Sequence, residues 1–318
     1  MKARAMVIHR FGGPEELKPA QIDVPDPGPG QLLVRVMASG TNPVDAKIRA
    51  NGTWAGIELP AVLGADVSGV VEKAGAGVTE FREGDEVYYT PEIYGNSRGS
   101  YADYNLVEAA VVAHKPKTLN HVEAAAVPLA GGTAWEAIVR RLAVRLGETV
   151  LIHGGAGGVG SFAVQIAKAS GARVLATAST ANQSTLRELG ADAPIDYKKE
   201  DFGDAVKRET NGAGVHAVFD CHGGDLAGKS LHIIRPFGRI ACILPPGGDL
   251  RLLYVKNLTL HGVFLTRERK RLEEMSTLIN QGKMRPLVTD VLPLEEVQKA
   301  HERLDTGHGR GKIVLRMS

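Results

Sequence analysis

The sequence is poor in cysteine. Its 318 residues include two cysteines, Cys221 and Cys242, and each stands within an apolar, strand-like segment. They do not form a disulfide framework, because cysteines in such segments are usually small buried hydrophobic residues. A chain of this length can build a large core without disulfides. We therefore expect a reducing compartment, and the cytoplasm is the predicted location.

Neither sign of charge dominates. The chain has 38 Lys and Arg against 36 Asp and Glu, a net charge of +2. Proteins that bind nucleic acids or anionic membranes usually carry an excess of basic residues. The basic run that begins at Arg267 is interrupted by glutamates, which is typical of a solvated helix face. We expect neither a nucleic acid nor a membrane as partner.

Long hydrophobic runs are also missing. The longest uncharged stretch, residues 150–167, approaches the length of a membrane span but contains His153, Gln165 and a central cluster of glycines. This composition favours a strand, a turn and a helix over a membrane helix. The N-terminus carries charges at Lys2, Arg4 and Arg10, so no signal-peptide core is expected there.

What the sequence does contain changes in character near His121. Before it, strand-like segments are separated by Gly and Pro, as in 25–30, which predicts a small, irregular β-rich domain. After it, short apolar strands alternate with helices, which predicts an α/β fold with a doubly wound parallel sheet. Strands are expected over 148–153, 173–177, 195–197, 215–220, 238–244 and 258–264, and helices over 121–129, 133–146, 159–169, 182–189, 267–280 and 294–304.

The run from Gly155 to Gly160 fits the pattern G-x-G-x-x-G. It follows an apolar strand and opens an amphipathic helix, and this context makes the pattern informative. Glycines let backbone N–H groups approach a pyrophosphate, and the start of a helix offers unpaired donors. The alternative is a purely structural turn. We predict dinucleotide binding, with Gly155, Gly157, Gly158 and Val159 as contacts.

The residues after the second strand bear on the choice of cofactor. Sites that prefer NAD usually place an acidic residue there to bind the ribose 2′-hydroxyl. The segment 176–182 has no acidic residue and offers hydroxyl groups at Thr177 and Ser179 instead. We therefore predict NADPH, with NADH the less favoured cofactor. The segment also lacks Lys and Arg, so a clamp for the 2′-phosphate is incomplete.

The glycine turn belongs to a longer spaced run, 147–151, then 154–160, then Gln165 and Lys168. This run resembles the signature of the zinc-independent quinone oxidoreductases of the medium-chain dehydrogenase/reductase superfamily, and the resemblance covers nearly the whole chain. Further segments similar to family landmarks are 42–45, 63–69, 99–104, 131–134, 189–192 with 196–197, and 311–315.

The resemblance implies a GroES-like catalytic domain from residues 1–121 and 282–318, with a Rossmann domain over 122–281 between them. It places Asn42 and Thr133 near the nicotinamide. It implies that the adenosine phosphate is approached by Tyr197 and by the strand tip with Thr177 and Ser179. Leu244 is a further expected contact, and the residues implied along the cofactor cleft are Phe264, Leu265 and Lys312.

A catalytic zinc is not expected. Zinc enzymes of this superfamily hold the metal with Cys, His and a further Cys or acidic residue. Asn42 stands in place of the first Cys, residues 63–66 replace the His-Glu segment, and the lobe of four structural cysteines is missing. Without zinc to polarise a carbonyl, the acceptor must itself be electron-poor, as a quinone or an α,β-unsaturated ketone is.

Catalysis should then consist mainly of holding the nicotinamide against the acceptor. Candidate catalytic residues are Asn42, Lys47 and Thr133, with Asn42 or Lys47 as a donor to the acceptor oxygen. Lys47 could equally be an ordinary surface lysine. Asp45 is expected to brace its loop rather than to exchange protons.

Two other functions stay open on this sequence. One is an enone or haloacrylate-type reductase on the same scaffold, which the pocket near Lys47, Trp54 and Tyr94 would decide. The other is an NADPH-binding sensor or structural protein with little turnover. A homodimer is also expected, because an apolar edge strand over 258–264 needs a partner strand or a covering helix.

Overall fold

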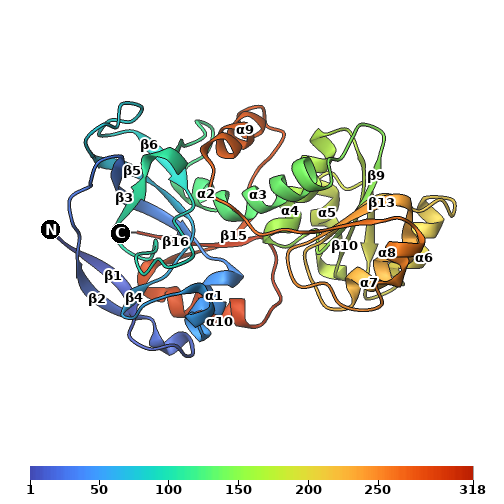
Figure 1. Ribbon diagram of the computed structural model, residues 1–318, viewed down its shortest axis with the longest axis horizontal. Coiled ribbons are helices and arrows are strands. Elements are labelled where there is room, and N and C mark those ends of the chain that lie inside the picture. The colour runs from blue at the N-terminus through green and yellow to red at the C-terminus, as the bar shows by residue number, and fades with distance from the viewer. Residues whose placement is uncertain (318) are drawn as a thin grey trace. The chain divides into compact units, whose positions relative to one another are not determined.

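The computed structural model describes residues 1–317 (Figure 1). The chain divides into two compact units. Unit 1 consists of Met1–Ala130, Thr266–Gln281 and the residues from Pro286 onward, and unit 2 consists of Gly131–Leu265 with Gly282–Arg285. The expected domain limits, 1–121 with 282–318 and 122–281, stay a prediction.

Unit 1 contains two β-sheets (Figure 1). The first has the order β2 (Lys18–Asp23), β1 (Lys2–Ile8), β4 (Ala61–Val62). The second has the order β15 (Val288–Pro293), β16 (Lys312–Arg316), β3 (Gln31–Gly40), β5 (Val67–Ala74), β6 (Glu86–Tyr89), β8 (Ala113–His114), with β7 (Tyr104–Glu108) also paired to β3. Its helices are α1 (Pro43–Ala50), α2 (His121–Ala125), α9 (Arg269–Asn280) and α10 (Val297–Asp305).

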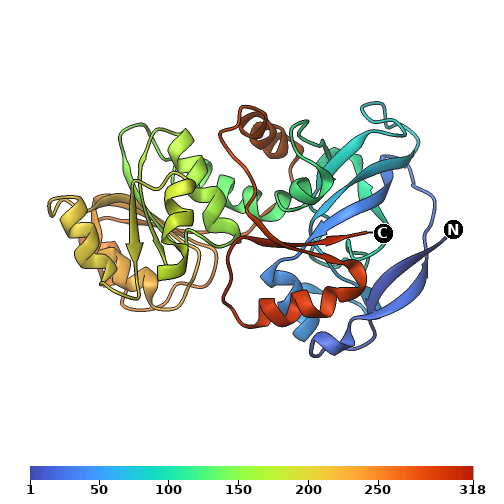
Figure 2. The same ribbon diagram turned by 180° about the vertical axis from the view of Figure 1, so that it is seen from behind.

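The last strand of the chain lies beside one of the first. β16 runs antiparallel to β3, with Val314 opposite Gly40 and Arg316 opposite Ala38. Small side chains let α2 pack closely here, and Gly40 has no room for a side chain, because a Cβ atom would lie 2.3 Å from the carbonyl oxygen of Ala125. Figure 2 shows α10 beside α1, so C-terminal elements complete the N-terminal unit on two sides.

Unit 2 is a six-stranded parallel sheet. Its order is β11 (Ala193–Asp196), β10 (Arg173–Ala178), β9 (Thr149–His153), β12 (Val215–Asp220), β13 (Ile234–Cys242), β14 (Thr259–Gly262). The order reverses beside β9, and ligands of such sheets bind at the carboxyl ends of the strands at this reversal. The helices are α3 (Pro128–Trp135), which begins in unit 1, α4 (Gly158–Ala169), α5 (Gln183–Glu188), α6 (Phe202–Glu209), α7 (Leu226–Ser230) and α8 (Arg251–Val255).

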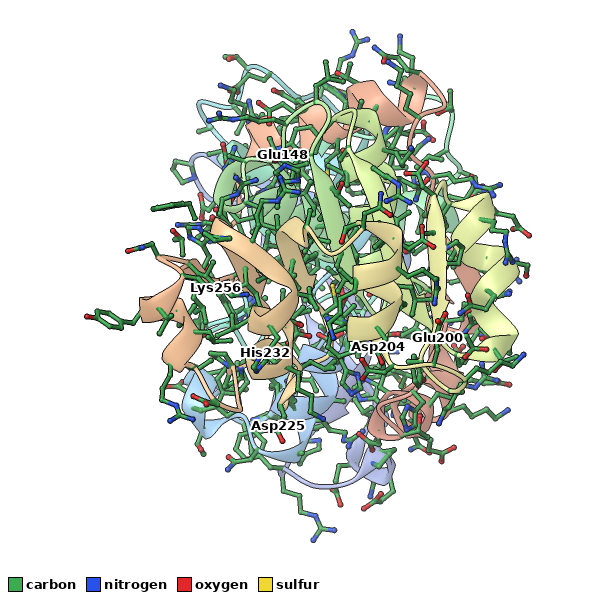
Figure 3. The ribbon with its side chains drawn as sticks, turned by 90° about the vertical axis from the view of Figure 1, so that its right-hand side faces the viewer. Glu148, Glu200, Asp204, Asp225, His232 and Lys256 are labelled. Carbon is green, nitrogen blue, oxygen red and sulfur yellow. The ribbon has the colours of Figure 1, made fainter. Side chains whose placement is uncertain are left out.

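Buried polar contacts fix the helices of unit 2. Lys256, after α8, donates to the carbonyl oxygens of Leu231, His232 and Ile234 at 2.8–2.9 Å. Figure 3 labels Lys256 and His232. Partial burial lowers the pKa of Lys256, and the three carbonyls use the three donors of its ammonium group. This lysine anchors the end of α8.

One expectation about the helices of unit 2 was wrong. The helix expected over 133–146 begins at Pro128 and continues from Glu136 to Arg141 as a π-helix. Gln165, a polar residue of α4, is buried. Its amide exchanges two hydrogen bonds with the backbone of Arg285, at 3.0 and 2.9 Å, which explains why 282–285 belongs to unit 2.

The uncharged stretch 150–167 is β9, a turn and α4, as expected. Within residues 1–317, no helix is long and apolar enough to cross a membrane.

Candidate active site

The glycine turn joins β9 to α4 at the reversal of the parallel sheet. Gly154 has a φ of 69°, which favours glycine, and the N–H of Gly155 donates to the carbonyl oxygen of Thr177 at 2.9 Å. Gly157 precedes the first turn of α4. A Cβ atom on Gly160 would lie 2.1 Å from the carbonyl oxygen of Gly154. The turn therefore packs tightly against the start of α4 and the end of β10. The first amides of α4 are then available to bind a diphosphate.

At the end of β10, Thr177 contacts the glycine turn. It is buried, and its hydroxyl accepts a hydrogen bond from the Gly154 N–H at 3.2 Å. Ser179 is half-buried, and its hydroxyl accepts from the side chain of Asn182 at 3.2 Å. The Thr177 side chain is thus less accessible than expected, and Ser179 is the more accessible hydroxyl at the tip.

A basic residue that the sequence analysis missed lies at the neighbouring strand tip. β11 pairs with β10 so that Asp196 is opposite Ala178, which brings Tyr197 and Lys198 to the same edge of the sheet as Ser179. Tyr197 is 48% exposed, and the ammonium group of Lys198 lies 5.4 Å from the centre of its ring. The pairing of the two strands supplies a positive charge that segment 176–182 lacks.

Below the turn lies a buried polar cluster. His153 contacts the hydroxyls of Ser230 at 2.9 Å and Thr177 at 3.3 Å, and burial lowers its pKa to about 4, so that it is neutral at pH 7. Oδ1 of Asp220 accepts from the N–H groups of His222 and Gly223 at 2.8 and 3.0 Å. This cluster supports the carboxyl ends of β9, β10 and β12.

In unit 1, Asn42 and Lys312 form one cluster with Asp66. Asn42 caps α1; its amide nitrogen donates to Oδ2 of Asp66 at 2.9 Å, and its amide oxygen accepts from Lys312. Lys312 also donates to Asp66 at 3.1 Å and to the carbonyl oxygen of Thr41 at 2.8 Å. Burial raises the pKa of Asp66, against the lowering effect of Lys312 and Asn42. The amide of Asn42 is thus held at both ends.

The other expected site residues are divided between unit 1 and unit 2. Lys47 is exposed on α1. Thr133 lies within α3 and is buried. The remaining cofactor contacts expected in unit 2 include the half-buried Leu244 and Leu265 and the exposed Phe264. The roles of these residues stay predictions.

Unit 1 also contains a pocket. Its wall combines aliphatic side chains with polar groups, among them the carboxyl groups of Asp45 and Glu92. The carboxylate of Glu92 is paired with Arg267 at 2.5 Å. Trp54 and Tyr94, which the sequence analysis associated with the substrate, are half exposed and meet edge to face with ring centres 6.0 Å apart. The lining residues are Asp45, Ile48, Ile57, Val62, Leu63, Gly64, Ala65, Glu92, Ile93, Asn96 and Gly99.

For residues 1–317, no group of three or more His, Cys, Asp or Glu side chains is placed to hold a metal ion. The position corresponding to the first zinc ligand is Asn42, and the nearest charged partner of its amide oxygen is the ammonium group of Lys312. A bound cation would meet this ammonium group, so the residues present do not suit zinc.

Comparisons with known proteins agree with this arrangement. Residues 28–117 match the alcohol dehydrogenase GroES-like domain, and residues 189–315 match the family described as zinc-binding dehydrogenase. A chloroplast protein of Arabidopsis thaliana named NADPH-dependent alkenal/one oxidoreductase is 36% identical, over 98% of this chain and 79% of its own length.

Two further proteins are similar over nearly their whole length. The human protein named quinone oxidoreductase is 32% identical, over 98% of this chain and 97% of its own. The crystal structure of an alcohol dehydrogenase superfamily protein from Novosphingobium aromaticivorans superposes with a TM-score of 0.93 at 36% identity, covering 99% of this chain and all of the other. A GroES-like domain and a Rossmann domain are therefore present, as expected. The chain belongs to the quinone oxidoreductase family of the medium-chain dehydrogenase/reductase superfamily, and it is an oxidoreductase that acts on a small molecule.

Proposed function

We propose that this protein is an NADPH-dependent reductase that transfers a hydride, without zinc, to a quinone or another conjugated carbonyl compound. The observation that carries the proposal is the glycine turn at the sheet reversal, where α4 begins and no acidic residue follows β10. The names of two relatives, NADPH-dependent alkenal/one oxidoreductase and quinone oxidoreductase, support the proposal. Bound NADPH would supply the hydride.

The strand tips of unit 2 favour NADPH over NADH. The amides at the start of α4, with Gly155, Gly157, Gly158 and Val159, would hold the diphosphate. Ser179, Tyr197 and Lys198 would surround the 2′-phosphate, which needs donors and positive charge rather than a carboxylate. The proposed contacts of the nicotinamide end remain Asn42, Thr133, Leu244, Phe264, Leu265 and Lys312.

The side chains that line the pocket of unit 1 favour an uncharged occupant over an anion. Its wall combines aliphatic side chains with the carboxyl groups of Asp45 and Glu92, and no Lys, Arg or His contributes to the lining that is described. A haloacrylate carries a carboxylate, and the lining that is described offers no cationic side chain to bind it. A quinone or enone carries no charge, so these compounds suit the pocket better.

An acceptor of this kind also suits the chemistry available. Because no metal polarises the carbonyl in this proposal, the acceptor must be electron-poor, and the protein contributes mainly by positioning it. The proposed catalytic residues are Asn42, Lys47 and Thr133. The amide of Asn42 is fixed by Asp66 and Lys312, so it offers a rigid wall rather than a mobile donor.

The test follows the absorbance of NADPH with the purified protein and a panel of quinones, enones, a haloacrylate and simple aldehydes. We expect oxidation with quinones or enones, the same rate after treatment with a zinc chelator, and weaker binding of NADH. Turnover of aldehydes alone, or only after zinc is added, would contradict the proposal. Tight NADPH binding without oxidation by any acceptor would instead favour a sensor.

We further propose a cytoplasmic homodimer. β14 ends the sheet of unit 2, and nearby side chains are unusually exposed for their type, with Phe237 at 75% and Tyr254 at 89%. Pairing of β14 with its copy would satisfy the free edge. Both cysteines are free thiols, which suits a reducing compartment. Light scattering should give twice the mass of the chain, and a monomer at micromolar concentration would contradict the dimer.

A further inference from the structure

We propose that Asp45 delivers the proton that accompanies hydride transfer, and that Tyr101, His301 and Arg49 position its carboxyl group through a directed chain of hydrogen bonds. This inference rests on the proposed reductase function. Reduction of a quinone or an enone consumes one hydride and one proton, and a positioned acid that touches the acceptor speeds the delivery of that proton.

Asp45 lines the pocket that the proposed function assigns to the acceptor. It is part of the pocket wall, on the first turn of α1, yet it is only 1% exposed. Its Oδ2 atom accepts the N–H of Asn42 at 2.8 Å and the hydroxyl of Tyr101 at 3.1 Å. In the part of the chain that is described, no hydrogen bond to Oδ1 is found, so this oxygen can serve an occupant of the pocket.

The chain behind Asp45 has a fixed direction. Nη1 of Arg49 lies 3.1 Å from Nδ1 of His301. A guanidinium group only donates, so Nδ1 must accept, and the neutral imidazole carries its hydrogen on Nε2. Nε2 lies 3.1 Å from the hydroxyl of Tyr101 and therefore donates to it. Tyr101 is left to donate its own hydrogen to Asp45.

The outer end of the chain is anchored. Arg49 is buried, and its Nη2 donates to both carboxylate oxygens of Asp305 at 3.0 and 2.8 Å. Burial and the nearby charge of Arg49 lower the pKa of His301 to about 3, so the ring stays neutral and keeps one tautomer. The chain cannot carry protons past Arg49, because a guanidinium does not release them. Tyr101, His301 and Arg49 therefore position Asp45, and solvent in the pocket must reprotonate its carboxyl group.

The surroundings of Asp45 allow both of its protonation states near neutral pH. Burial is the largest effect and raises its pKa to about 7, and the charge of Asp66 acts in the same direction. The Asn42 N–H, the charge of Lys312 and the hydroxyl of Tyr101 lower it. Glu92, paired with Arg267, is the other carboxyl group of the pocket. An acid is most useful when its pKa lies near the working pH.

The proton transfer balances with the proposed reduction. Hydride addition converts a quinone to the hydroquinone monoanion, or an enone to its enolate. The O–H bond of Asp45 then breaks as an O–H bond forms on the hydroquinone, or as a C–H or O–H bond forms on the enolate. Asp45 is left as the carboxylate and takes its next proton from water. No further oxidant or reductant is required.

The purely structural alternative is that Asp45 only caps α1 through its bond to Asn42. Asp45→Asn separates the two roles, because an amide oxygen still accepts from Asn42 but the amide cannot act as an acid. Tyr101→Phe removes one donor to Asp45. Tyr89→Phe is the matched control, since Tyr89 is equally buried, bonds to Asn105 at 3.0 Å and takes no part in the chain.

The experiment measures the pH profile of kcat for quinone reduction, together with infrared titration of the Asp45 carboxyl group in the absence of cofactor and substrate. We expect wild-type kcat to fall as pH rises through about 7, because the acid form is lost. Asp45→Asn should lower kcat by about 10²- to 10⁴-fold, without change in NADPH affinity. It should also remove this fall in kcat with rising pH, the high-pH limb of the profile. Tyr101→Phe should move both the limb and the infrared titration to higher pH, and Tyr89→Phe should move neither.

Retention of kcat and of the limb in Asp45→Asn would overturn the inference, and so would an unchanged infrared titration in Tyr101→Phe. A failure of the proposed function looks different. In that case the wild-type protein itself would not oxidise NADPH with any quinone or enone. The proposed proton delivery by Asp45 would then be contradicted as well. The infrared titration would still report whether Tyr101 controls the carboxyl group.

Discussion

Lys312 and Asp66 form a buried ion pair at 3.1 Å, although 246 positions separate them in the sequence. Lys312 is 4% exposed and Asp66 is inaccessible to solvent. Each needs the other, because an isolated buried charge is strongly unfavourable. Lys312 reaches this position because β16 pairs with β3, so the C-terminal strand supplies the cation for a site built by residues near the N-terminus.

Replacement of Lys312 by Met should therefore destabilise the protein. We expect a loss of about 3–5 kcal/mol in the free energy of unfolding at pH 8, measured with urea, because Asp66 is left without its cation. Loss of the cation raises the pKa of Asp66 further, so the protonated form becomes the favoured one in the folded protein. Stability is then lost as pH rises, and the deficit should be smaller at pH 5.

The control is Lys299→Met, which removes an exposed pair with Glu296 and should cost less than about 1 kcal/mol. An equal deficit of Lys312→Met at pH 5 and pH 8 would show that the ion pair is not what the variant loses.

Gly160→Ala should damage the glycine turn. The new methyl group would lie 2.1 Å from the carbonyl oxygen of Gly154, so the start of α4 must move away from the turn. We expect more than about tenfold weaker NADPH binding, measured by fluorescence titration, and a lower melting temperature. Gly309→Ala is the control, because a Cβ atom there meets nothing within 4 Å. Unchanged affinity in Gly160→Ala would argue against a diphosphate at this turn.

Lys198→Ala tests the origin of the cofactor preference. Lys198 is exposed, so its contribution to a phosphate contact should be about 1 kcal/mol, or about 5- to 10-fold in the dissociation constant of NADPH. The affinity for NADH, which lacks the 2′-phosphate, should not change. Lys207→Ala, on α6 and paired with Asp204, is the control with the same change of net charge. A parallel loss of NADH affinity would place Lys198 away from the 2′-phosphate.

The buried histidines should make the protein sensitive to acid. The folded-state pKa of His301 is about 3 and that of His153 about 4, both below the ordinary value of 6.5. At these two residues the unfolded chain therefore binds protons that the folded chain does not, and the contribution of the histidines to stability falls as pH drops from about 6.5, while the raised pKa of Asp45 acts in the opposite direction. Between pH 7 and pH 5 each histidine should cost about 2 kcal/mol.

Urea unfolding of His301→Gln at the two pH values checks this expectation. The variant should be less stable at pH 7, since it alters contacts with Tyr101 and Arg49, but its loss between pH 7 and pH 5 should be smaller than that of the wild type. His308→Gln, at an exposed position, should keep the wild-type difference. A His301→Gln variant that loses as much stability between pH 7 and pH 5 as the wild type would rule out a neutral buried His301.

The sequence predicts the limits of a strand or helix well where the pattern of apolar residues lies within that element. β12 has the limits, 215–220, that its apolar run predicts. Three signals at the start of α1 were overlooked, namely Asn42 as cap, Pro43 in the first turn and Asp45 three residues after the cap. α6 was missed although Asp201 caps it, with hydrogen bonds to the N–H groups of Gly203 and Asp204.

The sequence by itself determined that a dinucleotide-binding turn is present, because its spacing, the strand before it and the helix after it are contiguous. Only the tertiary structure decided that Lys198 lies at the same edge of the sheet as Ser179, that Lys312 meets Asp66, and that Arg49, His301 and Tyr101 form a chain ending at Asp45. These contacts join residues on different strands and helices. Their distances are set by strand pairing and helix packing, which no local pattern of residues encodes.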